Sequence, residues 1–239
     1  MMFNTTFSSS RHASQGRRAG LLAALTLVVV LAACSDISIT FNDGDSKVQG
    51  SGVKRTETRA VAAFTSIEAT GIGSLKLRVG ESDGLKITAD DNLLPFIKSE
   101  VKSGVLVLST KGASSSKNSI VFEATAKTIK RLENSGTVSI DASGFSGGKL
   151  LVLASGVGGV TLSGRVESLK AELSGVGSLS AEGLIADHVE TSLSGVGSAN
   201  VRAEKSLDGN VSGVGSLNWK GAATDVSTTV SGIGRVSKG

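Results

Sequence analysis

The residue best placed for chemistry is Cys34, the only cysteine of the chain, which ends the motif Leu-Ala-Ala-Cys over residues 31–34. Signal peptidase cleaves this pattern in front of a diacylated cysteine. Arg11, Arg17 and Arg18 precede an apolar run over residues 21–33 that is too short for a permanent transmembrane helix. The sequence therefore predicts a lipoprotein signal peptide over residues 1–33 and lipid, such as palmitate, on Cys34. An ordinary secretory signal that happens to contain a cysteine is the alternative.

Lipid on Cys34 would make the membrane the first partner of this chain. Each buried CH₂ group of an acyl chain contributes about 0.8 kcal/mol, so two or three chains give a firm anchor. Ser35 follows the cysteine directly, which favours sorting to the outer membrane of a Gram-negative cell. We expect a lipid-anchored location in the cell envelope, and the leaflet and the side of the membrane stay open.

Residues suited to acid–base or metal chemistry are few. His188 is the one histidine after residue 33, and a lone imidazole makes neither a triad nor a metal site. Glu172, Glu190 and Asp208 come nearest to the carboxylate cluster that a polysaccharide-cleaving enzyme needs. Glu190 and Asp208 share one repeat position with Lys170, so a solvated ladder of charges is expected there. We predict no catalytic residue, no metal site, no cofactor and no enzyme, with a carbohydrate-active β-helix enzyme as the alternative.

The charge of the exported chain excludes one class of partner. The leader contains three of the 25 basic residues and none of the 21 acidic ones, which leaves a net charge of +1 after cleavage. Nucleic-acid binding depends on clustered basic residues that neutralise phosphates, so no nucleic-acid partner is expected.

A sequence repeat predicts the secondary structure that positions these residues. Ser-Gly-Val/Ile-Gly recurs in steps of 18 to 20 residues, with a weaker copy at residues 135–138; the five clear copies begin at Ser155, Ser174, Ser194, Ser212 and Ser231. Aligned on that serine, every odd offset is apolar or small, as strands with one buried face require. A unit this short buries its apolar face only by stacking on its neighbours. The sequence predicts a right-handed parallel β-helix, an all-β solenoid of roughly 19-residue rungs, with an irregular β-rich N-terminal part.

Strand alternation also predicts what the repeat leaves outside. If it continues through the Ser-Gly-Val-Gly turn, one aliphatic side chain per rung points outward and forms a candidate binding ladder of Val157, Val176, Val196, Val214 and Ile233. The alternative is a bulge at the glycines that turns these side chains inward. Trp219 falls on an inward position and is expected to fill the core.

Three blocks of sequence carry a family resemblance: residues 59–67 with 71–79, Asp91-Asn92-Leu93-Leu94, and the Ser-Gly-x-Gly repeats. Through them the chain resembles the putative auto-transporter adhesin, head GIN domain family of bacterial envelope proteins. The resemblance implies a right-handed parallel β-helix in the envelope. Members often have Ser-Gly-Ser-Gly-Asp where this chain has Ser-Gly-Val-Gly-Ser, so the aliphatic ladder is a departure from the family pattern.

The domain organisation and function follow from these parts. We predict a flexible, lipid-anchored tether over residues 34–55 and a GIN-like β-helix domain over residues 56–239, with repeats strongest over residues 135–239. The leading hypothesis is a non-catalytic surface-presentation or binding module, adhesin-like, whose partner is an envelope protein or glycan. Homotypic assembly into an oligomer through the unpaired edge of the last rung is a further alternative.

Overall fold

The computed structural model describes residues 48–110 and 113–239, and within them nearly every element is a β-strand. The predicted signal peptide, Cys34 and residues 34–47 of the predicted tether lie outside the described residues. One short 3₁₀ helix, η1 (Leu94–Phe96), interrupts the strands within the described residues and contains Pro95. None of the helical segments in the described part of the chain is long and apolar enough to cross a membrane.

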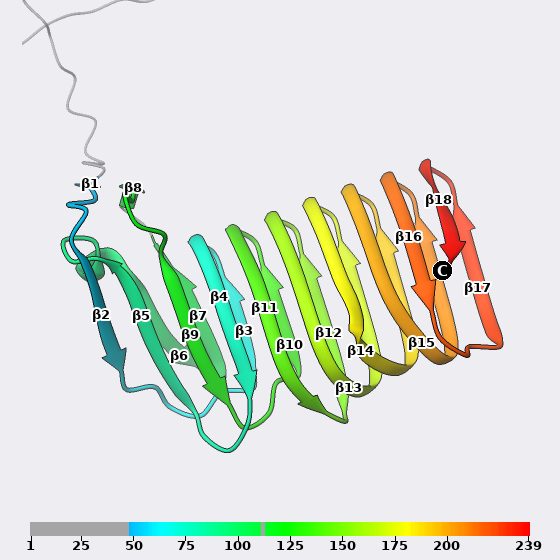
Figure 1. Ribbon diagram of the computed structural model, residues 1–239, viewed down its shortest axis with the longest axis horizontal. Coiled ribbons are helices and arrows are strands. Elements are labelled where there is room, and N and C mark those ends of the chain that lie inside the picture. Colours follow the sequence, from blue (N-terminus) through cyan, green and yellow to red (C-terminus); the bar gives the residue numbers. More distant parts are fainter. Residues whose placement is uncertain (1–47, 111–112) are drawn as a thin grey trace, which may run out of the picture. The chain divides into compact units, whose positions relative to one another are not determined.

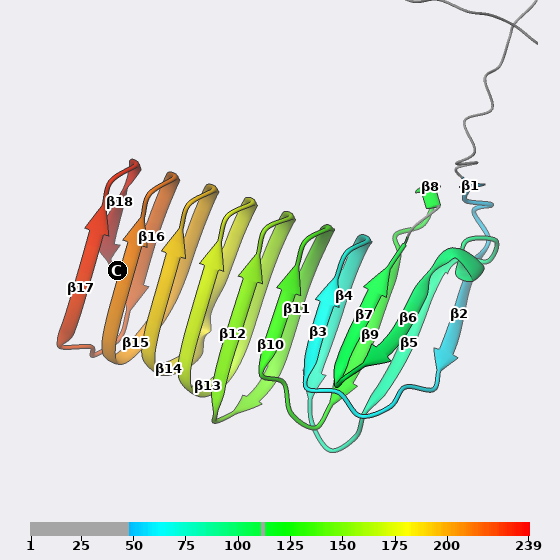
Figure 2. The same cartoon turned by 180° about the vertical axis from the view of Figure 1, so that it is seen from behind.

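The strands form two parallel walls that face each other, and one turn of chain through both walls is called a rung here (Figures 1 and 2). The first wall contains β3 (Ser66–Ala69), β10 (Arg131–Asn134), β12 (Lys149–Ala154) and β17 (Asp225–Val230). The second contains β4 (Ile72–Val79), β11 (Thr137–Ser146), β16 (Val214–Lys220) and β18 (Ile233–Lys238). Three long strands run through both walls: β13 (Val157–Leu173), β14 (Val176–Leu193) and β15 (Val196–Val211).

The coil is right-handed, as predicted. In Figure 1 the colours advance from left to right while the front strands, β16 and β18 among them, run downward. Neighbouring rungs pair in parallel over most of their length, so residues one repeat apart lie side by side. The predicted parallel β-helix is confirmed.

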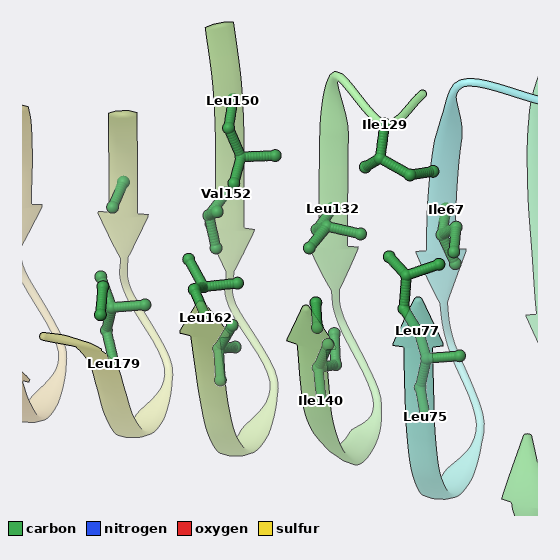
Figure 3. Packing of buried hydrophobic residues seen from close by; sticks show 14 of the residues in the cluster. Ile67, Leu75, Leu77, Ile129, Leu132, Ile140, Leu150, Val152, Leu162 and Leu179 are labelled. Carbon is green, nitrogen blue, oxygen red and sulfur yellow. The ribbon is translucent and has the colours of Figure 1, made fainter. Parts of the chain in front are cut away.

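The core lies between the walls and consists of the apolar columns of the repeat (Figure 3). Leu150, Leu169, Val189 and Leu207 are neighbours on successive rungs, and each is buried. The last rung differs: Val226 and Val230 are 40% and 43% exposed, because β17 has a neighbouring strand on one side only. Trp219 fills the core as expected, and the Lys238 ammonium lies 4.4 Å from the centre of its ring.

The irregular N-terminal part is an insertion that stacks against the direction of the coil. After the rung formed by β3 and β4, residues 80–130 return to the other side of that rung. There β7 (Val105–Ser109) pairs with β3, and β9 (Val121–Ala126) pairs with β4, both in parallel. Three antiparallel strands then close this end: β2 (Lys54–Arg59), β5 (Gly84–Asp90) and β6 (Lys98–Lys102). The two outer edge strands, β2 and β6, carry charged side chains. Charges on an edge strand discourage pairing with a strand of another molecule.

The segment before β2 is tied to this cap, which differs from the predicted tether over residues 34–55. β1 (Val48–Gln49) pairs in parallel with β8 (Ala113–Ser115). The Asn92 amide accepts a hydrogen bond from the backbone N–H of Ser51 at 2.9 Å and donates one to the carbonyl of Gln49 at 2.8 Å. Backbone and side-chain partners therefore hold residues 48–55, which the polar, glycine-containing sequence alone did not indicate.

Candidate binding surface

Each rung passes from the first wall to the second through a Ser-Gly-Val-Gly turn with a fixed pattern of hydrogen bonds. In the rung of β14, the N–H groups of Ser174 and Gly175 both donate to the carbonyl of Ala154, at 2.9 and 3.1 Å. The N–H of Val176 donates to the carbonyl of Gly156 at 3.0 Å. The turns at Ser155, Ser194, Ser212 and Ser231 repeat this pattern. The same backbone geometry therefore presents one aliphatic side chain at every rung.

These side chains point outward, as strand alternation predicts. Val157, Val176, Val196 and Val214 are 48–54% exposed, and Ile233 is 78% exposed. Each is paired in register with the next, so the five form a continuous row along one long edge of the β-helix. We call this row the Val/Ile ladder. Its exposure is confirmed, and its binding role stays a prediction.

The glycines of the turn are required by contact between rungs. A Cβ atom on Gly175 would lie 1.9 Å from the carbonyl oxygen of Gly156, and one on Gly177 would lie 1.9 Å from that of Gly158. The missing side chain therefore lets each turn rest directly on the backbone of the preceding turn.

The column of the ladder extends past the repeats from which it was predicted, although its aliphatic member there, Ile72, is partly buried against the core. Thr137 lies beside Val157 in the same column, and Ile72 lies beside Thr137. The signal for Ile72 was present in the sequence, because Thr70-Gly71-Ile72-Gly73-Ser74 matches the turn motif with threonine in place of serine. The inserted residues 80–130 separate this copy from the others and break the period of the repeat.

On the rungs of β13 to β18, the two columns of the second wall that lie nearest the ladder contain almost no charge. These two outward columns consist of glycine, serine, threonine and asparagine, and Arg235 is the one charged side chain in them. The first column is Gly159, Ser178, Ser198, Ser216 and Arg235. The second column is Thr161, Ser180, Asn200, Asn218 and Ser237. Hydrogen bonds run along the second column. Asn218 donates to Asn200 at 2.9 Å, and Ser237 donates to Asn218 at 2.6 Å. Together with the ladder, these columns form a surface of methyl, hydroxyl and amide groups.

The long edge opposite the ladder contains charged side chains that form ion pairs. The Asp187 carboxylate lies 3.2 Å from Arg165 and 2.8 Å from Lys205. The hydrogen bond from Lys205, with the charges of both cations, lowers the pKa of Asp187. Lys220 and Glu182 form a further ion pair there at 3.3 Å. The edge away from the ladder thus contains a cluster of ion pairs.

The candidate acid–base residues lie on the outer face of the first wall. Lys170 contacts Glu190 at 2.6 Å and Glu172 at 3.5 Å, and these carboxylates raise its pKa. The predicted charge ladder is therefore confirmed at Lys170 and Glu190. Glu190 and Asp208 are paired across neighbouring strands and border an open hollow of about 400 Å³.

His188 is exposed, as expected for a solvated residue, and its Nδ1 lies 2.8 Å from the Ser206 hydroxyl. Within residues 48–110 and 113–239, no three His, Cys, Asp or Glu side chains converge as a metal site would require.

Comparisons with known proteins agree with this architecture. A family model described as putative auto-transporter adhesin, head GIN domain matches residues 63–223. A solved structure of a putative adhesin from Bacteroides fragilis NCTC 9343 is 26% identical, with a TM-score of 0.65, and the match covers 80% of this chain and 99% of that one. A putative adhesin from Parabacteroides distasonis ATCC 8503 shares the fold at 20% identity and a TM-score of 0.50, over 80% of this chain and 99% of that one. No curated protein matches the chain.

Proposed function

The chain belongs to the putative auto-transporter adhesin, head GIN domain family, and we propose that it is a non-catalytic binding module of the cell envelope that contacts its partner through the Val/Ile ladder. The observation that carries this proposal is the row of five aliphatic side chains, in register and 48–78% exposed. Soluble proteins rarely expose contiguous apolar rows, and such rows commonly mark contact sites.

The rigidity of the surface supports the same role. Every ladder residue is held by a backbone hydrogen bond to the preceding rung, so little conformational entropy is lost when a partner binds. The similar structure from Bacteroides fragilis is described as a putative adhesin, which supports a surface or envelope location. For this chain we further propose outer-membrane anchoring through lipid on Cys34.

A substitution on the ladder tests the binding role. Val176→Lys places a charge in the middle of the row at an exposed position, where the fold tolerates it. The full chain carrying this change should capture less envelope protein or glycan than the unchanged chain. Val53→Lys is the matched control, because Val53 is an exposed valine, at 60%, that lies outside the ladder. Equal recovery of every partner by the two variants would reject the ladder as the binding site.

The enzyme alternative has its own measurement. If the hollow beside Glu190 and Asp208 were a catalytic cleft, the chain would cleave an envelope polysaccharide, and Glu190→Gln or Asp208→Asn would abolish the cleavage. We expect no cleavage by the unchanged chain, because Glu190 is already engaged by Lys170 at the surface.

A further inference from the structure

We infer that the partner of the Val/Ile ladder is the ladder of a second copy of this chain. This inference rests on the proposed function, since it takes the ladder as the contact surface. It goes further by naming the occupant.

The spacing of the ladder is the first argument. Strand pairing fixes one aliphatic side chain per rung, and neighbouring rungs lie about 4.8 Å apart. A partner with any other repeat would match one or two rungs and then fall out of step. A second copy has the identical repeat, so its side chains can pack against the row at every rung, as in the dry contacts between identical stacked strands.

The distribution of charge is the second argument. A parallel contact between two identical surfaces brings each charge near its own copy, and an antiparallel contact does so at its centre, which is unfavourable for a surface with many charges of one sign. The ladder edge has few charges: the two outward columns on its second-wall side include only Arg235, and the two on its first-wall side include only Glu172. The opposite edge, with Arg165, Asp187 and Lys205, shows that the fold accommodates charge where the ladder is absent.

The size of the surface sets the strength of the contact. Five rungs and three outward columns cover roughly 500 Å² per copy, from about 4.8 Å between rungs and about 6.6 Å between columns. A standard interface buries about 800 Å² from each partner. The contact is therefore weak between free copies and becomes occupied where anchoring confines the chains to one surface and raises their effective concentration.

Cysteine substitution in cells tests the inference on the full, anchored chain. Val196→Cys places a thiol at the centre of the ladder, and mild oxidation should give a disulfide-linked dimer on a non-reducing gel. Val157→Cys and Ile233→Cys report the orientation: self-cross-linking at all three positions means parallel copies, and cross-linking at Val196→Cys alone means antiparallel copies. The unchanged chain controls for Cys34, and Val53→Cys controls for random collisions of exposed thiols. We expect several-fold more dimer with Val196→Cys than with either control.

Two results would overturn the inference. One is no dimer above the controls at any ladder position. The other is cross-linking through Val230→Cys on β17 alone, which would indicate stacking of rung edges. If Val176→Lys loses a foreign partner while the ladder thiols form no dimer, the ladder is a binding site for that partner and the homotypic inference alone is rejected.

Discussion

At the scale of single residues, the glycines of the turn are the strictest requirement of the fold. We expect Gly175→Ala to destabilise the protein by about 3 kcal/mol or more, because the added Cβ would lie 1.9 Å from a backbone oxygen that cannot move without shifting a rung. Gly183→Ala is the control, since a Cβ there meets its nearest atom at an ordinary 3.4 Å. Urea unfolding of the two variants measures the difference, and equal midpoints would contradict the steric account.

Asp90 predicts a dependence of stability on pH. Its side chain is fully buried and accepts hydrogen bonds from the Asn118 amide at 2.5 Å, the Lys117 N–H at 2.9 Å and the Ser116 hydroxyl at 3.1 Å. These bonds, with that from Asn118 the largest cause, lower the pKa of Asp90 in the folded state. A lowered pKa stabilises the fold above the unfolded value near 3.9, and this contribution is lost as the pH falls through the folded pKa.

Asp90→Asn should therefore unfold at a lower urea concentration than the unchanged chain at pH 7. Below about pH 3.9 the difference should shrink, because the unfolded state of the unchanged chain then takes up a proton that the folded carboxylate, with its lowered pKa, takes up only at lower pH. Unfolding curves of both proteins at pH 7 and pH 3 measure this. A difference that stays constant between the two pH values would show that the charge of Asp90 is not what holds the segment at residues 116–118.

The sequence indicated some of these residue roles and concealed others. Alternation along a strand was enough to place Val176 outside and Leu179 inside, because both follow from local backbone geometry. The role of Asp90 depends on partners 26 to 28 residues away, brought to it by the insertion. Nothing in the local pattern around Asp90 signals those contacts.

At the scale of elements, the repeat predicted the stacked rungs, and the insertion is the part that it could not predict. The rung of β3 and β4 has the same turn as the others, so its place in the column follows once Gly71-Ile72-Gly73 is recognised. Residues 80–130 have two sides of the β3–β4 rung on which to stack, and in the structure they stack on the side away from the other repeats. The period of the sequence is the same for either choice, so it contains no information about the side.

The two ends of the β-helix differ as elements, and this predicts where unfolding begins. At one end, antiparallel β2 and β6 cover the core, and Arg59 donates to the carbonyls of Leu94 and Ile97 at 2.9 and 2.6 Å. At the other end, every residue of β17 is exposed. We expect the amides of β17 and β18 to exchange with deuterium faster than those of β14, which has a strand on both sides. Uniform protection across these three strands would contradict this prediction.

At the scale of the whole molecule, the parallel stack converts a short sequence motif into a surface. One valine per rung is an ordinary exposed residue, and five in register form a row with a fixed spacing. The same stacking collects Arg165, Asp187 and Lys205 on the opposite edge. A molecule with one sparsely charged and one charged edge has a defined direction of contact, which is useful to a module that works at a surface.

Such a module needs an attachment, and Cys34 is the predicted one. In cells fed an alkyne analogue of palmitate, the unchanged chain should take up the label and be released from membranes only by detergent, because its acyl chains contribute about 0.8 kcal/mol per buried CH₂. Cys34→Ala should lose the label and appear in the soluble fraction. Ser35→Asp should keep the label and move from the outer to the inner membrane, since the residue after the cysteine directs sorting. An unlabelled chain, or a label that persists in Cys34→Ala, would remove the anchor, and with it the confinement that a contact of roughly 500 Å² per copy requires.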